Sequence, residues 1–420
     1  MSVAVDRLAN GLIVAADPMN GLETVALGVW VKLGARWEPL TLNGASHLLE
    51  HMAFKGAGGR SARDIAQAVE DRGALLNAAT SYERTSYHTR ALADDVEALV
   101  DLLADILRRP HFDPDDFALE QDVVHQEIGE ARATPDDYVF ELFQTACFGD
   151  TPLGRPILGA PDRLDALTPQ IVRAYAERHH RPDRLMLVGA GAVGLERLSQ
   201  AAETAFGDWF ADAVEDSPEP AQFLGGVQTE PRKTEQTHLV IGFAGPAADA
   251  TPELRYAAHA LVEILGGGMS SRLFQDVREA RGLAYTIDAF LESYQGVGGM
   301  GIYAACASEK TGEVARLSLE ALDALAQSGP TDAELNRAKA QFCAGWLRAR
   351  EAPAARAETL AAQLHLDGAP TPAEVVLERL AAVEPEAVRA AAQTALAGPR
   401  AVAGLGPKRP LASLAGIAEA

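Results

Sequence analysis

Cysteine is scarce in this chain of 420 residues, which has only Cys147, Cys306 and Cys343. Their number is odd and their positions are far apart, so they form neither the close pairs that bind metal ions nor a framework of paired disulfides. The sequence therefore argues against a cysteine-based metal site. It predicts buried thiols in a reducing compartment.

Long apolar runs are also absent. No stretch approaches the ~18 apolar residues that a membrane-spanning helix requires. The opening sequence MSVAVDRLANGLIVAADP lacks the basic start, apolar core and small-residue cleavage site of a secretory signal. We therefore expect a cytoplasmic protein with no membrane partner.

Positive charge is outweighed by negative charge, with 37 Lys and Arg against 59 Asp and Glu and a net charge of −22. This balance excludes the basic surface of a typical nucleic-acid-binding protein. The negative charge either keeps the protein soluble through self-repulsion or lines an interior that attracts basic peptides. The sequence leaves both interpretations open.

The length suggests two or three domains, because a domain usually has roughly 100–200 residues. Residues 213–234 are rich in proline, glycine and charge and show no periodicity. They are predicted to be a linker between a first domain, 1–212, and a second domain, 235–420.

The two predicted domains repeat one plan of strands and helices. Helices are expected to begin near Pro114 in the first domain and after Pro330 in the second. Aligning these two starts offsets the halves by about 218 residues. At this offset the segment HLLEH corresponds to Leu265–Met269, which includes the glycines 266–268. The metal-binding residues would then belong to the first domain alone.

The segment His47-Leu48-Leu49-Glu50-His51 is the most informative motif in the sequence. Two histidines four positions apart on a helix present both imidazoles on one face, where they can bind one ion. Glu50 lies near the same face, as suits a carboxylate that takes a proton from water beside the metal. The alternative is an ordinary helix with polar side chains. The apolar neighbours disfavour it, because unpartnered buried polar groups are costly.

A third ligand has to come from another segment, because a catalytic zinc site usually has three protein ligands and one open position. Glu127 and Glu130 are the candidates. Glu120 precedes Glu127 by two helical turns and shares its face, so it could orient a ligand or water from behind. The spacing alone leaves the choice between Glu127 and Glu130 open.

The motif order H-x-x-E-H resembles that of the inverzincin peptidases, which include pitrilysin, insulin-degrading enzyme and the mitochondrial processing peptidase. Further similar blocks extend the resemblance over nearly the whole chain: GALLNAATSYERTSYH, QDVVHQEIGEARATPDDYVFE, LGGGMSSRLFQDVREARGLAYTI and AVAGLGP. The short bacterial members are the most similar in size. The resemblance implies an α+β fold with two homologous domains, each an antiparallel sheet with helices packed on one face.

By this resemblance, His47, His51 and Glu127 hold Zn²⁺, and Glu50 is the general base. Glu120 is the carboxylate that supports the site from behind. The family spacing from His51 favours Glu127 over Glu130 as the third ligand.

The resemblance also implies substrate contacts. Asn77 and Ala78 match a pair on the edge strand that takes the substrate backbone by strand addition. Arg278 and Tyr285 match an arginine–tyrosine pair of the second domain that contacts bound peptide. Gly267 lies in a segment that resembles a substrate-contacting glycine-rich loop.

Other matches have equally good structural interpretations. Phe54 occupies the place of an aromatic near the pocket after the scissile bond, but it could also be a core residue. Asp137 and Glu141 fall where the processing peptidase recognises arginine, but they also suit a solvated helix start. Tyr82 replaces an arginine that many relatives carry, which leaves the substrate preference open.

The sequence thus predicts a zinc-dependent endopeptidase that cleaves unfolded peptides or extended protein termini. A homodimer is expected, with Arg278 and Tyr285 supplied by the partner, and a heterodimer is the alternative. A non-catalytic subunit or scaffold would be expected to have damaged ligands, whereas the motif is intact. A zinc lyase with the same motif would be a shorter, single-domain chain.

Overall fold

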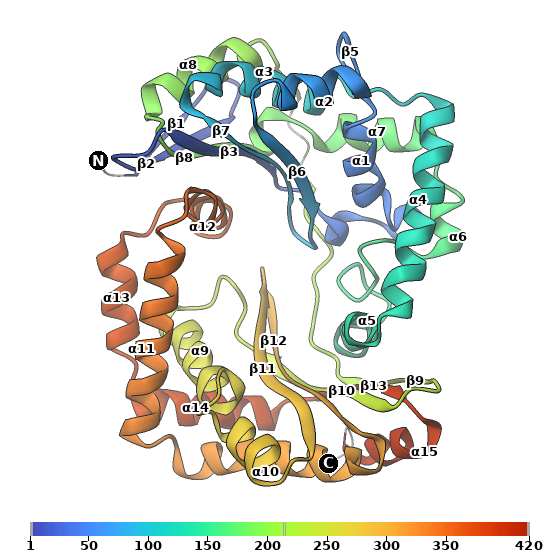
Figure 1. The fold of residues 1–420 in the computed structure, drawn as a ribbon, viewed down its shortest axis with the longest axis vertical. Coiled ribbons are helices and arrows are strands. Elements are labelled where there is room, and N and C mark those ends of the chain that lie inside the picture. The colour runs from blue at the N-terminus through green and yellow to red at the C-terminus, as the bar shows by residue number, and fades with distance from the viewer. Residues whose placement is uncertain (1–2, 213, 215, 418–420) are drawn as a thin grey trace. The chain divides into compact units, whose positions relative to one another are not determined.

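The protein is described here from a computed structural model that covers residues 3–212, 214 and 216–417 (Figure 1). Its chain forms two compact units, each built from three segments. Unit 1 comprises Met1–Ile128, Pro156–Glu219 and Leu347–Pro370, and unit 2 comprises Gly129–Arg155, Pro220–Trp346 and Thr371–Ala420. Residues 213 and 215 of the predicted linker lie outside the described residues. The contiguous ranges 1–212 and 235–420 stay a prediction.

Unit 1 contains a six-stranded sheet with the strand order β1-β2-β8-β3-β7-β6. The strands are β1 Ala4–Arg7, β2 Ile13–Pro18, β3 Thr24–Val31, β6 Leu75–Thr80, β7 Thr85–Leu92 and β8 Leu185–Gly191. Strand β8 is parallel to β2, and the other neighbours are antiparallel. Among the described residues, strand β6 has a neighbour on one side only, so its other edge is open for pairing.

The main core of unit 1 lies between one face of this sheet and a layer of helices. These helices are α1 Ala45–Ala53, α2 Ala62–Glu70, α3 Val96–Arg108, α4 Pro114–Ala133, α7 Pro169–His179 and α8 Leu195–Phe206. Short elements complete the unit: α6 Pro161–Leu164, the hairpin β4 Gly56–Ala57 and β5 Arg60–Ser61, and 3₁₀ turns at Ala35–Trp37, Leu40–Leu42, Ala93–Asp95 and Pro182–Arg184. The opposite face of the sheet is covered by α12 Pro353–Leu366, which packs against Trp30, Met186 and Val188.

Unit 2 contains a five-stranded sheet with the strand order β11-β12-β10-β13-β9. The strands are β9 Gly226–Pro231, β10 Gln236–Gly245, β11 Ala284–Tyr294, β12 Val297–Ala307 and β13 Arg400–Gly406. Strand β9 is parallel to β13, and the other pairs are antiparallel. The sequence range 213–234 was expected to be entirely linker, so β9 corrects that expectation. Its mostly exposed side chains carry no strand periodicity, and its pairing partner lies far along the chain.

Helices also cover both faces of the unit 2 sheet. The main core involves α9 Pro252–Gly266, α10 Thr311–Ser328, α14 Pro385–Ala397 and a π-helix at Phe274–Ala280. The other elements are α11 Asp332–Ala349, α13 Ala373–Ala381, α15 Lys408–Leu411 and 3₁₀ turns at Ser308–Lys310 and Ala412–Ile417. On the opposite face, α5 Pro135–Phe148 packs so closely that a Cβ atom on Gly242 would lie 2.2 Å from the ring of Phe143.

The two units repeat one topology. The strands β2, β8, β3, β7 and β6 correspond in order to β9, β13, β10, β12 and β11. The predicted α+β class with two similar halves is therefore confirmed. The sheets are mixed rather than purely antiparallel, because β8 pairs in parallel with β2 in unit 1 and β13 pairs in parallel with β9 in unit 2.

The halves also exchange one helix each, which the sequence did not predict. Helix α5 follows α4 in the first half of the chain yet packs in unit 2, and α12 follows α11 in the second half yet packs in unit 1. Each sheet therefore carries a helix on the face opposite its main core. Helices were expected on one face of each sheet. Most helices do lie on one face, but α5 and α12 each cover the opposite face.

The structure also revises the expected match between HLLEH and Leu265–Met269. The starts of α4 and α11 differ by 218 residues (114 and 332), but the starts of β3 and β10 differ by 212 (24 and 236). Helix α9 follows β10 as α1 follows β3, and it ends at Gly266. The counterpart of the motif therefore lies within α9, before the run of glycines. No described helix is long and apolar enough to cross a membrane.

Candidate metal centre

Helix α1 carries His47, Glu50 and His51, and its first turn is held by a buried carboxylate. The N-cap residue Gly44 has a φ of +95° and offers no side chain. Instead Glu38 accepts hydrogen bonds from the backbone N–H groups of Gly44 (2.8 Å) and Ser46 (2.7 Å). Burial raises the pKa of Glu38 to about 7, although these hydrogen bonds oppose the rise.

The two faces of α1 have different environments. Leu48, Leu49 and Met52 are buried in the core of unit 1. His47 and His51 are half-buried on the other face, and their ring centroids lie 4.7 Å apart. The apolar face fixes the helix, so the imidazoles are presented together.

Helix α4 brings Glu127 to these histidines. Its Oε2 atom lies 3.8 Å from His47 Nε2 and 3.5 Å from His51 Nε2. One ligand atom from each of the three residues lies within 4.8 Å of the others, and no other group of three such residues does so in the described part of the chain. The structure thus brings Glu127, and not Glu130, to the histidine pair.

This donor set fits zinc. Two imidazole nitrogens and one carboxylate oxygen form a three-ligand site that leaves one position for water or substrate. Burial, assisted by the neighbouring His51, lowers the pKa of His47 to about 4, so its imidazole is neutral, as a metal ligand has to be. His47, His51 and Glu127 are therefore the residues that would hold the ion.

Glu120 lies behind His51. The Nδ1 atom of His51 donates a hydrogen bond to Glu120 Oε2 at 2.8 Å, and the Glu120 side chain is only 5% exposed. The second oxygen of Glu120 forms an ion pair with Lys55 Nζ. Such a carboxylate fixes the orientation of the imidazole and makes it a stronger ligand. Sequence reasoning missed Lys55, whose one signal was its place just beyond the motif.

Glu50 is joined to the edge strand β6. The Thr80 hydroxyl donates a hydrogen bond of 2.5 Å to Glu50 Oε2. Burial raises the pKa of Glu50 and the Glu127 charge adds to the rise, whereas Thr80 and His51 oppose it. Sequence reasoning missed Thr80, because it lies 30 residues from Glu50 along the chain.

Asn77, Ala78 and Phe54 also lie in unit 1. Asn77 and Ala78 are on β6, where Asn77 is exposed and Ala78 is half-buried. Phe54 directly follows α1, packs against the core, and has its ring centroid 6.2 Å from that of Tyr87. The core contacts of Phe54 agree with the structural interpretation, and its substrate role remains a prediction.

Arg278, Tyr285 and Gly267 lie in unit 2. The guanidinium of Arg278 lies 5.6 Å from the Tyr285 ring centroid. Tyr285 is 74% exposed and sits where the register between β11 and β12 shifts, so a β-bulge turns it outward. Gly267 directly follows α9, and a Cβ atom there would lie 2.6 Å from Glu263 Cα.

Asp137 and Glu141 both lie on α5 in unit 2. Burial raises the pKa of Glu141; Arg132 opposes the rise and Asp137 adds to it. Glu141 is therefore not the fully solvated residue of a simple helix start.

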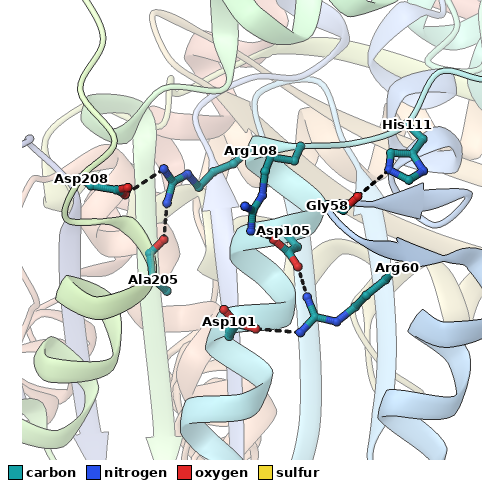
Figure 2. Close-up of polar contacts among 9 residues, drawn as sticks. Gly58, Arg60, Asp101, Asp105, Arg108, His111, Ala205 and Asp208 are labelled. Atoms are coloured by element: carbon teal, nitrogen blue, oxygen red, sulfur yellow. Dashed lines mark hydrogen bonds and ion pairs between the residues drawn. The ribbon is translucent and has the colours of Figure 1, made fainter.

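The chain after α1 is tied to α3 by a separate polar cluster (Figure 2). Asp105 forms ion pairs with Arg60 and Arg109, and Arg60 also contacts Asp101 at 2.8 Å. His111 Nε2 lies 2.9 Å from the Gly58 carbonyl oxygen. This cluster fixes the β4–β5 hairpin that follows α1.

A cavity of about 620 Å³ borders the same cluster, but none of the candidate zinc ligands lines it. Arg108 lines this cavity and is held by Asp208 and by the Ala205 carbonyl oxygen (Figure 2). Arg109, another lining residue, is paired with Asp105. These ion pairs are consistent with a structural role for the arginines.

Comparison with protein families gives two adjoining matches. The model described as "Insulinase (Peptidase family M16)" matches residues 14–161, and the model described as "Peptidase M16 inactive domain" matches residues 166–342. The first match contains His47, His51 and Glu127.

Curated relatives match over most of the chain. A protein of Streptomyces coelicolor called an uncharacterized zinc protease is 34% identical over 410 residues, which cover 95% of this chain and 88% of the relative. A Mycobacterium tuberculosis protein described in the same words is 35% identical over 406 residues, covering 95% and 92%. A Bacillus subtilis protein called uncharacterized zinc protease YmxG is 35% identical over 333 residues, which cover 79% of this chain and 81% of the relative.

A solved structure shares the fold. The crystal structure of a protease from Helicobacter pylori superposes with a TM-score of 0.87 at 20% sequence identity, and the match covers 97% of this chain and 99% of that one.

Proposed function

This chain belongs to the insulinase (M16) family of peptidases, and on that premise we propose that it is a zinc-dependent endopeptidase that cleaves unfolded peptides or extended protein termini. The observation that carries the proposal is the meeting of His47, His51 and Glu127 at one point, beside Glu50. A scaffold protein would have no need of this intact donor set.

In the proposed mechanism, Glu50 acts as the general base and acid. When bound, zinc polarises the scissile carbonyl and makes water easier to deprotonate. Glu50 accepts a proton from the attacking water, whose oxygen bonds to the carbonyl carbon. The carbon–nitrogen bond then breaks, and Glu50 gives the proton to the leaving amine. Glu120 holds His51 in place through the Nδ1 hydrogen bond, and Lys55 balances the Glu120 charge.

The open edge of β6 indicates that the substrate binds in an extended conformation. Asn77 and Ala78 lie on this strand, and its unpaired backbone groups can hydrogen-bond to a peptide that adds as a further strand. A folded segment cannot offer its backbone in this way. The proposed substrates are therefore unfolded peptides and flexible termini.

Cleavage of a mixed peptide library together with zinc quantification tests the proposal. Glu50→Gln removes the proton acceptor but leaves the three ligands, so we expect unchanged zinc content and a loss of about 10²–10⁴-fold in cleavage rate. Unchanged cleavage at full zinc occupancy would show that Glu50 is not the base. Absence of zinc and of cleavage in the native protein, with a heteromeric partner excluded, would favour the scaffold alternative.

We further propose a homodimer in which Arg278 and Tyr285 of one chain contact peptide bound at the zinc site of the other. The exposed Tyr285 ring beside Arg278 supports a contact role. Mixing Glu50→Gln chains with Arg278→Ala chains tests it, because each mixed dimer has one site with both functional groups. We expect cleavage to recover above that of either variant alone. No recovery in confirmed mixed dimers would mean that Arg278 does not act across chains.

We also propose that the protein works in the cytoplasm. Cys147, Cys306 and Cys343 are all free, and the first two are buried, as suits a reducing compartment. Fractionation of cells that produce the protein at its native level would test this location.

A further inference from the structure

Strand β6 ends on Thr80, and this residue connects the open edge of the sheet to Glu50. Within β6 the half-buried side chains of Leu76, Ala78 and Thr80 alternate with exposed ones. Leu76 and Ala78 pack against the core that includes α1, so Thr80 lies on the same face of the strand. The Thr80 hydroxyl reaches Glu50 Oε2 at 2.5 Å.

This hydrogen bond fixes the position of one oxygen of the Glu50 carboxylate. In the described part of the chain, Thr80 is the one residue whose side chain forms a hydrogen bond to this carboxylate. The Thr80 hydroxyl therefore holds Oε2, and the Thr80 backbone N–H also hydrogen-bonds to the carboxylate. The orientation of the base depends on where the end of β6 places the Thr80 hydroxyl.

We propose that Thr80 is a positioning residue that couples pairing of the substrate along β6 to the orientation of Glu50. The proposal rests on the proposed function. It adds that a peptide backbone bound at the edge strand does more than deliver the scissile bond, because it also orders the base.

The coupling follows from the position of Thr80 in the sheet. Thr80 pairs with Thr85 of β7 in the last pair before the turn, and no other described strand pairs with the open side of β6. The turn after Thr80 is held by the N–H groups of Ala35 and Arg36, which donate hydrogen bonds to the Ser81 and Tyr82 carbonyl oxygens. The open side of β6 has no such hydrogen bonds in the described part of the chain, and an edge with fewer hydrogen bonds fluctuates more than the centre of a sheet. A peptide strand that pairs with β6 adds hydrogen bonds on the open side and thus reduces the motion of Thr80. Its hydroxyl then holds Glu50 in one orientation for proton transfer.

Variants at position 80 separate this role from folding. Thr80→Val removes the hydroxyl but keeps the β-branched shape and the strand preference. Thr80→Ser keeps the hydroxyl. Each variant would be assayed with two peptides that share one scissile bond, one long enough to pair with all of β6 and one too short to do so. Zinc content and thermal unfolding are the controls.

We expect the native protein to have a higher kcat for the long peptide than for the short one. Thr80→Val should lower kcat for the long peptide by about 10- to 100-fold, the usual effect of losing a hydrogen bond to a charged group, and should change KM by less than about twofold. Its ratio of long-peptide to short-peptide kcat should approach one. Thr80→Ser should keep kcat within about threefold of the native value.

Two outcomes would overturn the proposal. One is a Thr80→Val protein with the native kcat ratio. The other is a rise in KM at unchanged kcat, which would make Thr80 a binding contact only. If Thr80→Val does not fold, a long peptide N-methylated where it pairs with β6 gives a readout in the native protein. Native kcat for that peptide would also overturn the coupling. Inactivity of the native protein towards every peptide would instead count against the proposed function.

Discussion

Glu127 and Glu130 show how much one helical turn matters at the level of single residues. Both lie on α4, three positions apart, but only Glu127 has an oxygen close to the Nε2 atoms of His47 and His51. Glu130 is exposed and is not part of the group of side chains that could hold one ion in the described part of the chain. We therefore expect that replacing Glu130 leaves zinc binding unchanged, whereas replacing Glu127 weakens it.

Replacement of these two glutamates gives a matched prediction. Glu127→Gln should weaken zinc binding by more than the roughly 10–100-fold typical of outer-shell changes, because it alters a direct ligand. Glu130→Gln should bind zinc as the native protein does. Competition with a chelator of known affinity measures both. If zinc affinity falls for Glu130→Gln and not for Glu127→Gln, the ligand assignment is wrong.

Glu38 gives a prediction about pH. Burial raises its pKa from an ordinary 4.5 to about 7 in the folded protein. Between pH 4.5 and pH 7, Glu38 is largely deprotonated in the unfolded chain but still protonated in the folded protein. The contribution of Glu38 to stability is therefore present at low pH and is lost as pH rises to about 7. At 1.36 kcal/mol for each pKa unit, the change amounts to about 3 kcal/mol.

Glu38→Gln should remove this pH dependence. Urea unfolding of the native protein and the variant at pH 4.5 and pH 8 measures it, and the difference between the two proteins cancels the contributions of the buried histidines. We expect the native protein to lose about 3 kcal/mol relative to the variant over this interval. A constant difference between the two proteins would contradict the raised pKa.

The sequence identified the residues of the site whose spacing carries a signal. His47, Glu50 and His51 lie within one helical turn and a half, and the resemblance selected Glu127 among distant glutamates. Thr80, Lys55 and Glu38 were missed, because their roles depend on contacts made only after the chain folds. No periodicity links a threonine at the end of a strand to a glutamate on a helix.

At the level of elements, the sequence indicated where particular helices begin but not what each helix packs against. The helices expected to begin near Pro114 and after Pro330 correspond to α4 and α11. Helices α5 and α12 each pack on a sheet formed mainly by the other half of the chain. A pattern shows which helix face is apolar, but it does not show which sheet that face will cover.

The packing of α12 gives a prediction at this level. Leu360 is 3% exposed and belongs to the cluster that covers Trp30 and Met186 in unit 1. Leu360→Ala should lower the free energy of unfolding by about 2–5 kcal/mol, because it leaves a cavity against the sheet. Leu119→Ala, at a leucine that is 57% exposed on α4, is the matched control and should change it by less than about 0.5 kcal/mol. Chemical denaturation measures both, and equal effects would contradict the packing.

At the level of the whole molecule, the repeat explains why one zinc site is expected. The two units share one strand order, but the helix α9 that corresponds to α1 lacks the HLLEH motif. Helix α11 corresponds to α4 with an offset of 218 residues (114 and 332). At this offset Glu120 corresponds to Ala338, and Glu127 corresponds to Gly345. The second unit thus keeps the fold without the ligands, which agrees with the description of its family model as an inactive domain.

The helix exchange predicts that the first half of the chain does not fold well alone. Residues 1–234 include the whole unit 1 sheet but lack α12, so Trp30, Met186 and Val188 would be exposed to solvent. They also carry α5 without the unit 2 sheet that it covers. We expect this fragment to bind a hydrophobic dye and to unfold without cooperativity, because exposed apolar patches favour association.

Fusing residues 347–370 to this fragment through a flexible linker restores the missing helix and should reduce dye binding. The same fusion with Leu360→Ala should reduce dye binding less. A fragment 1–234 that is monomeric, binds no dye and unfolds cooperatively would show that α12 is dispensable and that the contiguous first half is an independent folding unit.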